Sequence, residues 1–261
     1  MLSGTRTPRA VTGIITLVTI LSTLPGHSAT KLQSQQQQSG LSWVMQAMQT
    51  LTGGAQISSV TEGGTVVWNG QSSGSITLQS TGNTNSQVSL TTSAGSRSET
   101  RSWASDGSGP VGQWTDLQGN QHQMAQHNCW ADSVWFFPAL SMLSDYSDPT
   151  MVYNDLGPTQ YNGHNVEHIQ AYRYISGLPQ DVQATLQKLT TVDYYLDSQT
   201  AIPVAMAFFV HADTDVHLDV PVVLVYSQYQ AVNGIQTPFQ VTRFSSGSPV
   251  YQITISSVNL G

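Results

Sequence analysis

Two histidines and a glutamate in His164-Asn165-Val166-Glu167-His168 follow the H-x-x-E-H spacing of some zinc peptidases. On a helix, histidines four residues apart share one face and can bind zinc, while Glu167 would act as the general base. Here the motif follows a Tyr-Asn-Gly turn and runs into a strand-like sequence, where residues four apart lie about 13 Å apart. The remaining glutamates, Glu62 and Glu99, lie far upstream, so the usual downstream ligand is missing. A zinc-dependent hydrolase that uses His164, Glu167 and His168 is therefore the least favoured alternative.

A second cluster, His211–Asp219, alternates three aspartates with two histidines. Oxygen and nitrogen ligands of this kind can bind a divalent ion, but the segment lacks the glycine and bidentate glutamate of a calcium loop. We interpret it as a polar loop between two strands and leave metal binding there open.

Cys129 is the only cysteine, which excludes an intramolecular disulfide. We expect an inert buried thiol, with a pair to His127 or His122 as the alternative. The sequence contains no nucleophile elbow, phosphate loop or dinucleotide fingerprint. We therefore predict no catalytic residue, no metal site and no cofactor.

Charged residues make up 9% of the 261 residues, against about 25% in an ordinary globular protein. The net charge of −7 comes without a basic stripe, which argues against nucleic acid and anionic lipid surfaces as partners. Such an uncharged but polar surface is frequent in exported proteins.

The N-terminus has the pattern of a cleavable signal peptide over residues 1–28. Arg6 and Arg9 precede an apolar core at Ala10–Leu24, and small residues at Gly26 and Ser28 suit cleavage before Ala29. A retained membrane anchor is the alternative, but the core is shorter than the roughly 20 residues of a spanning helix. No cysteine lies near the cleavage position, so the sequence predicts a periplasmic or secreted protein without a lipid anchor.

Residues 29–40 are polar and glutamine-rich, and we expect a linker there. Three helices are then predicted from apolar residues at helical spacing. They cover Leu41–Leu51, Gln126–Tyr146 with a kink at Pro138, and a short segment that starts at Pro179 and contains Val182, Leu186 and Leu189.

Most of the remaining chain predicts antiparallel strands. Residues 57–123 hold short polar strands separated by Gly, Asn and Ser clusters, which is typical of a meander. Two strands follow at Met151–Asp155 and Asn165–Ile175, and a run of hairpins occupies residues 191–259, including a tight turn at Asn233-Gly234. The sequence thus predicts a mainly β, α+β domain over residues 41–261.

Three stretches resemble LolA/LolB-like exported proteins. Val225–Phe239 is similar to their closing hairpin, Tyr195–Pro203 to their Asp-x-x-Thr-x-x-Pro hairpin, and Asp106-Gly107 occupies the corresponding turn. The resemblance implies a strongly curved antiparallel sheet, an open half-barrel, with two or three helices on its concave side. It also implies an apolar cavity that holds acyl chains or another hydrophobic ligand.

If the resemblance holds, the first two predicted helices line this cavity. The candidate ligand-lining residues are Val44, Met45, Met48, Trp130, Val134, Phe137 and Leu140. Arg97 and Arg101 lie in the region of the carriers' ligand-gating arginine, although neither aligns to its motif.

The expected function is therefore non-catalytic binding of a hydrophobic small molecule or lipid by a monomer, with membrane lipoproteins as further partners. A structural or surface β-protein without a ligand is the main alternative.

Overall fold

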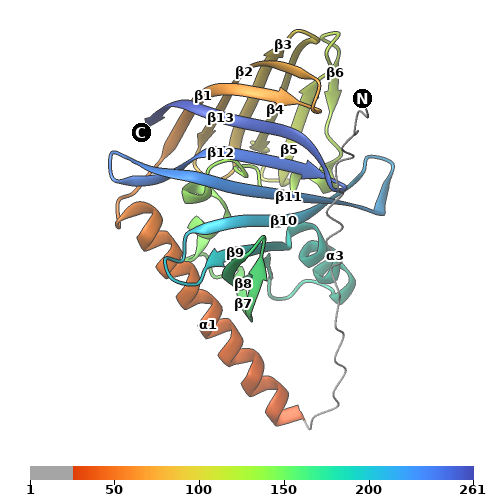
Figure 1. The fold of residues 1–261 in the computed structure, drawn as a ribbon. Helices are drawn as coiled ribbons and strands as arrows, with labels where there is room; N and C mark the ends of the chain where they lie inside the picture. The colour runs from red at the N-terminus through yellow and green to blue at the C-terminus, as the bar shows by residue number, and fades with distance from the viewer. Residues whose placement is uncertain (1–25) are drawn as a thin grey trace, which may run out of the picture.

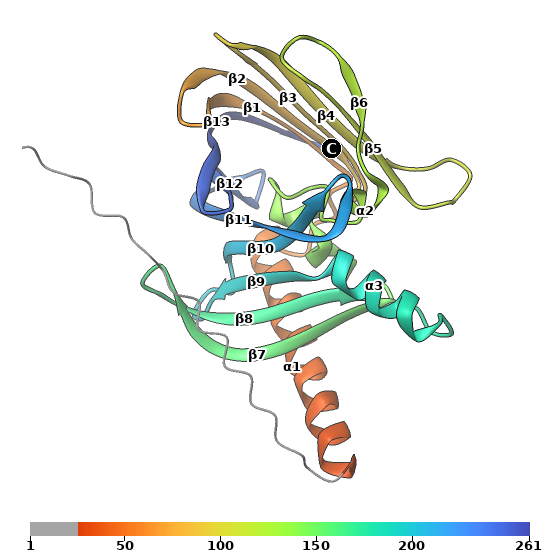
Figure 2. The same cartoon turned by 90° about the vertical axis from the view of Figure 1, so that its right-hand side faces the viewer.

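The computed structural model describes residues 26–261, and the strands within this range form one antiparallel sheet of 13 strands (Figure 1). The strands follow in the spatial order β6-β5-β4-β3-β2-β1-β13-β12-β11-β10-β9-β8-β7. The sheet is strongly curved and does not close on itself, so β6 and β7 remain as edges (Figure 2). The predicted half-barrel is confirmed. Residues 1–25, and with them most of the predicted signal peptide, lie outside the described residues.

The elements divide into two groups of strands and a few helical segments. The first group is the meander β1 (Ser59–Trp68), β2 (Ser72–Thr81), β3 (Asn85–Thr92), β4 (Gly95–Trp103), β5 (Pro110–Thr115) and β6 (Gln121–Gln123). The second group is β7 (Met151–Tyr161), β8 (His164–Arg173), β9 (Val192–Asp197), β10 (Pro203–Ala212), β11 (Asp215–Val232), β12 (Ile235–Ser245) and β13 (Ser248–Leu260). The helices are α1 (Gly26–Thr52), α2 (Gln126–Cys129) and α3 (Gln180–Thr190), and 3-10 turns cover Pro138–Leu140 and Met142–Asp145.

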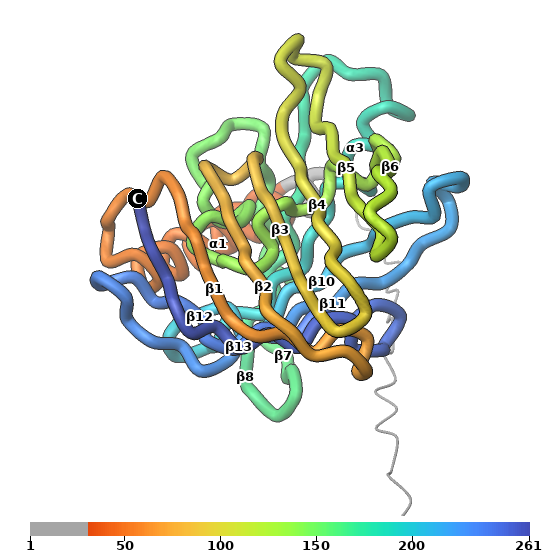
Figure 3. Tube along the Cα trace, turned by 90° about the horizontal axis from the view of Figure 1, so that it is seen from above, coloured from red at the N-terminus to blue at the C-terminus, as the bar shows by residue number. Residues whose placement is uncertain are grey.

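The two groups are joined by β1 and β13, which pair over nearly their whole length. A bulge between Gly63 and Gly64 interrupts their register. Gly64 needs to be glycine, because an added Cβ there would collide with the carbonyl oxygen of Thr254. The view from above shows β13 lying beside β1 at the centre of the sheet (Figure 3).

The last strand, β13, alternates between buried and exposed residues, as its sequence pattern of apolar and polar residues predicts. Tyr251, Ile253 and Ile255 are buried, whereas the residues between them are exposed. The turn before β12 is also as predicted, with positive φ at Asn233 (51°) and Gly234 (86°). A period of two thus places one face of β13 in the core and leaves the other in water.

Helix α1 is longer than predicted and includes residues 29–40, where we expected a linker. Glutamine, alanine, leucine and lysine favour helix, which accounts for the continuation. The helix lies close to β7, since a Cβ on Gly40 would collide with the carbonyl oxygen of Tyr153, and Ser39 donates a hydrogen bond to Asp155. The predicted cleavage position before Ala29 falls within the first turn of α1, and the domain boundaries stay a prediction. Among residues 26–261, no helix combines the length and apolar character needed to cross a membrane.

The predicted helix over Gln126–Tyr146 is wrong. Only α2 and the two 3-10 turns are helical, and Pro138 opens the first of these turns. We call residues 125–148 the plug, because they fill the concave side of the sheet. Asp132, Ser133 and Ser141 hydrogen-bond with backbone groups within or beside this segment, which favours turns over a regular helix. The third predicted helix, α3, is confirmed.

Glu62 on β1 is a buried acid without a partner. Its side chain has 0% exposure, and neither carboxylate oxygen has a hydrogen-bond partner among the described residues. Its neighbours in register are Leu78 and Val258, both apolar. Burial raises the pKa of Glu62 well above its usual value, so the folded chain holds this proton more tightly than the unfolded chain does.

We expect Glu62→Gln to raise the melting temperature at about pH 8 and to change it little at about pH 4. The raised pKa of Glu62 makes the wild type lose stability as pH rises above the usual glutamate value of about 4.3, and glutamine cannot ionise. Thermal unfolding followed by circular dichroism at several pH values measures the difference. Glu62→Met also removes the unpartnered polar atoms. It should therefore increase the free energy of unfolding by about 1–3 kcal/mol at every pH. If the melting temperatures of wild type and Glu62→Gln differed by the same amount at every pH, the raised pKa of Glu62 would be contradicted.

Candidate functional site

The concave side of the sheet, where the resemblance places a ligand cavity, is filled by the plug. Trp135, Phe136 and Phe137 are among the largest fully buried side chains of the described residues. They belong to one continuous core with Val44 and Leu51 of α1 and with the inward residues of the sheet.

The plug is held in this position by Asp132. Its carboxylate accepts hydrogen bonds from the backbone N–H groups of Val134 (3.0 Å) and Met142 (3.0 Å), and from the hydroxyl of Tyr194 on β9 (3.1 Å). Burial raises the pKa of Asp132, and these donors oppose the rise. One carboxylate thus connects both halves of the plug to the sheet.

Two more tyrosine hydroxyls from the sheet bind carbonyl groups of the plug. Tyr153 on β7 donates to Met142 O (2.8 Å), and Tyr226 on β11 donates to Trp135 O (2.5 Å). Burial raises the pKa of Tyr226, so its hydroxyl stays protonated and remains a donor. Backbone groups that would pair within a regular helix are satisfied here by side chains.

The predicted ligand-lining residues do not all face one cavity. Val44, Met48, Val134, Phe137 and Leu140 are buried in the core, whereas Met45 is 52% exposed. Trp130 is half-buried and lies elsewhere, against α3 and in edge-to-face contact with Trp103, with ring centroids 5.8 Å apart. The seven residues therefore do not share one surface, and a role in ligand binding stays a prediction for each of them.

Three of the seven, Met45, Met48 and Leu140, border one cleft of about 800 Å³. It lies between the C-terminal half of α1, the 3-10 turns of the plug and the start of β1, and Ile57 and Tyr146 contribute further apolar surface. Its volume falls within the roughly 300–1,000 Å³ of small-molecule sites.

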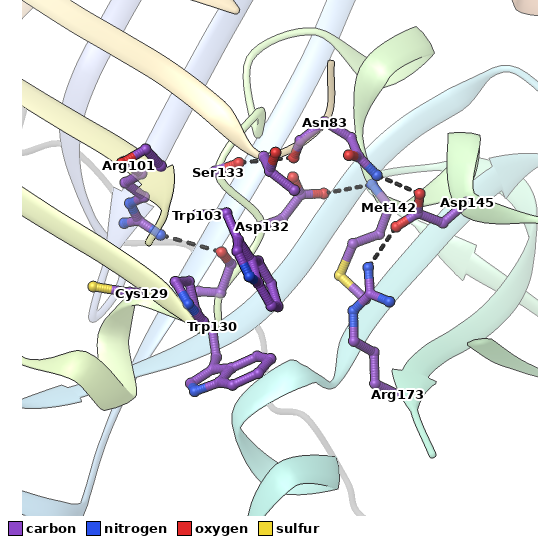
Figure 4. Close-up of a pocket in the computed structure, with 14 residues that line it drawn as sticks. Asn83, Arg101, Trp103, Cys129, Trp130, Asp132, Ser133, Met142, Asp145 and Arg173 are labelled. Carbon is purple, nitrogen blue, oxygen red and sulfur yellow. Dashed lines mark hydrogen bonds and ion pairs between the residues drawn. The ribbon is translucent and has the colours of Figure 1, made fainter. Parts of the chain in front are cut away.

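A smaller pocket of about 50 Å³, which is too small for an acyl chain, lies beside Trp130, Asp132 and Ser133 of the plug (Figure 4). Asn83 of the β2–β3 turn and Asp145 of the plug border both this pocket and the cleft, and they are hydrogen-bonded to each other. Asp145 also pairs with Arg173 of β8 (2.6 Å), and Arg173 pairs with Asp148 (2.8 Å). These polar contacts connect the two halves of the sheet through the plug.

The zinc motif lies on β8, as the strand-like sequence predicted. His164 and His168 point to one face and Glu167 to the other, because side chains alternate along a strand. His168 instead hydrogen-bonds with Asp193 (2.9 Å) on the neighbouring strand. The described residues contain no group of three His, Cys, Asp or Glu side chains that could hold a metal ion.

The segment His211–Asp219 is not the polar loop that we predicted, because it forms the tip of the β10–β11 hairpin. His211 is buried, with its Nε2 3.2 Å from Asp219 Oδ1, and burial together with Lys188 lowers its pKa. Asn128 of α2 exchanges two hydrogen bonds (2.7 and 2.8 Å) with the backbone of His211. The histidine thus marks the place where α2 attaches to the sheet.

Cys129 is buried, as predicted, and burial raises the pKa of its thiol. Neither candidate histidine pairs with it. His127 contacts Ala212 O (3.1 Å), and His122 stacks on Trp114 with ring centroids 4.2 Å apart. The geometry therefore provides no thiolate nucleophile.

Comparisons with known proteins reveal similarity in structure only: no family model and no curated protein matches the sequence. A DUF1329 family protein from Desulfovibrio piger superposes with a TM-score of 0.52 at 12% identity, over 86% of this chain and 93% of its own. A domain from Vibrio parahaemolyticus assigned to outer membrane lipoprotein-sorting proteins gives 0.50 at 10% identity, over 85% and 92%. The fold is LolA-like. A LolA superfamily protein from Nitrosomonas europaea also matches, with 10% identity, 85% and 93% coverage and a TM-score of 0.45.

The LolA-like fold confirms the resemblance drawn from the hairpin sequences. At these identities it establishes the arrangement of strands and leaves ligand and partner to be argued from this chain's own residues. The polar residues that hold the plug were missed by the sequence interpretation. The only signal for them is that Asp132 and Ser133 interrupt a strongly apolar run.

We expect Asp132→Ala to destabilise the LolA-like domain by about 3 kcal/mol or more. The substitution leaves two buried N–H groups and a tyrosine hydroxyl without an acceptor, and each such group costs about 1–3 kcal/mol. Denaturant unfolding measures the loss, and amide exchange should accelerate first in the plug. Asp181→Ala, an exposed aspartate in α3, is the control and should stay within about 0.5 kcal/mol. A loss below about 1 kcal/mol for Asp132→Ala would contradict its role.

Proposed function

We propose that this protein is an exported, non-catalytic binding protein for a hydrophobic ligand, either a lipid or a lipoprotein acyl chain. The observation that supports this best is the cleft of about 800 Å³ beside α1, which combines exposed and buried apolar side chains within a LolA-like fold. Two methionines, Met45 and Met48, border it, and methionine adapts to ligands of irregular shape. The signal-like N-terminus supports a periplasmic or secreted location.

The ligand would enter between α1 and the 3-10 turns of the plug. Met45 is largely exposed, while Met48 and Leu140 are 9% and 4% exposed and form the inner boundary of the cleft. An acyl chain that follows this path would replace water along the cleft. It would reach the space under the sheet only by moving Leu140 and the neighbouring plug residues.

The filled interior supports a second candidate, a structural or surface β-protein without a ligand. Trp135, Phe136 and Phe137 have at most 1% exposure, so the space that would hold a ligand is already occupied by the chain itself. In this case the cleft beside α1 is an ordinary surface groove.

Native mass spectrometry of residues 29–261, purified without detergent from the protein's own host, tests the two candidates. A co-purifying lipid or other hydrophobic mass is the result expected for a binding protein, and it identifies the ligand class. A bare polypeptide mass that stays bare after incubation with lipids would contradict binding and favour the structural candidate.

The position of the binding site is tested by Met45→Glu. We expect this variant to weaken binding of the uncharged probe N-phenyl-1-naphthylamine about tenfold, because a carboxylate beside an apolar ligand loses hydration. Fluorescence titration gives the dissociation constants.

Leu32→Glu is the matched control, since Leu32 lies on the same helix and is 51% exposed against 52% for Met45, but does not border the cleft. It should bind the probe as the wild type does. Equal affinities of the two variants would place the site elsewhere.

A further inference from the structure

A group of charged side chains lies on the inner face of the meander. Arg97, Glu99 and Arg101 alternate along β4. Their register partners on β3 include Leu90, opposite Arg97, and Val88, opposite Glu99, and both are buried in the core. Because paired residues point to the same side of a sheet, these charges face the concave side.

The opposite half of the sheet contributes a third arginine, Arg243 on β12. Its guanidinium lies 5.0 Å from the ring centre of Trp135 in the plug and 5.9 Å from that of Tyr251 on β13. Arg97 lies in the same way over Trp114 of β5, at 4.4 Å. Arg97 and Arg243 are both half-buried, and each guanidinium lies near the face of an aromatic ring.

The single carboxylate of this group, that of Glu99, is already paired with Arg101. Glu99 Oε1 lies 3.0 Å from Arg101 Nη2 and accepts a hydrogen bond from its Nε at 3.1 Å. Arg101 also donates to the carbonyl oxygens of Asn128 and Ala131, at 3.2 Å each, so it anchors the plug. Among residues 26–261, no ion pair involves Arg97 or Arg243.

Three arginines thus share one carboxylate, which leaves two positive charges unbalanced within this group, in a chain whose net charge is −7. An arginine stays protonated in proteins, so it cannot become neutral to lower the free-energy cost of its desolvation. A bound anion offsets this cost. The positive charges affect the pKa of the neighbouring Glu99 carboxylate. Burial alone would raise the pKa of Glu99, but the charges of Arg101, Arg243 and Arg97 outweigh it and lower the pKa.

We propose that Arg97 and Arg243 form a binding site for the anionic group, a carboxylate or a phosphate, of a small organic molecule. Trp114 provides apolar surface beside Arg97, and Trp135 and Tyr251 provide it beside Arg243, so the preferred ligand carries an apolar part next to its charge. A guanidinium binds such oxygens through two parallel hydrogen bonds. The site is separate from the cleft beside α1, and none of its residues borders that cleft.

Isothermal titration calorimetry with decanoate, decanol and inorganic phosphate tests the site. The wild type should bind decanoate at least about tenfold more tightly than decanol, which has the same chain without the charge. Arg97→Gln and Arg243→Gln should each remove most of this preference and leave decanol binding unchanged. Arg97 is the safer position, because Arg243 also packs on the plug.

Lys31→Gln is the control for net charge, since Lys31 is exposed on α1, far along the chain from the site. Loss of the preference in Arg97→Gln and Arg243→Gln but not in Lys31→Gln supports the site. Decanoate and decanol binding equally well, or Lys31→Gln weakening decanoate as much as the other two, would overturn it.

Inorganic phosphate identifies the source of the anion. Phosphate binding that depends on the two arginines and matches decanoate in affinity indicates a site for free anions, whereas decanoate alone indicates the head group of an amphiphile. Met45→Glu should leave the preference for decanoate intact, so failure of the cleft and failure of this site are distinguished.

Discussion

A buried segment without regular secondary structure must find partners for every backbone donor and acceptor, and the rest of this structure depends on how the plug meets that demand. A helix would satisfy these groups internally. The plug instead uses Asp132 as a shared acceptor and tyrosine hydroxyls from β7, β9 and β11 as partners. These partners come from different strands. The same hydrogen bonds therefore hold the plug in position and favour the curvature that brings the strands around it. A flatter sheet would separate Tyr153 from Tyr226 and leave the plug unsupported.

Much of the sheet was predictable, because its signals are local. Alternation in β13 and the Asn233-Gly234 turn each need only a few neighbouring residues to be read. The plug was not predictable in this way. Trp130, Val134, Phe137 and Leu140 have helical spacing, but side-chain hydrogen bonds to distant backbone groups decided the conformation. Local periodicity contains no information about Tyr194, which lies 62 positions from Asp132.

The candidate sites were predictable only in part, for a related reason. Met45, Met48 and Leu140 were expected near a ligand, and they do border one cleft. Arg97 was expected to lie near a ligand from the resemblance, whereas nothing in the local sequence pointed to Arg243, which lies on β12 in the other half of the sheet. Glu62 lies in a polar strand sequence that gives no hint of its complete burial. The surroundings of Arg243 and Glu62 depend on which strands pair and in which register. Local patterns in a single sequence do not specify this pairing.

The pairing of β1 with β13 has a consequence for how the chain reaches its folded state. Val60 pairs with Leu260, 200 positions later, and the carbonyl oxygen of Gly261 accepts hydrogen bonds from Ser58 and Ser59. The meander β1–β6 can assemble early from local hairpins, yet one side of β1 stays unpaired until β13 has been synthesised. Such long-range pairing slows folding, and an open strand edge can recruit another chain in the meantime. Because of this topology, the newly synthesised chain needs protection from association with other chains until β13 pairs with β1.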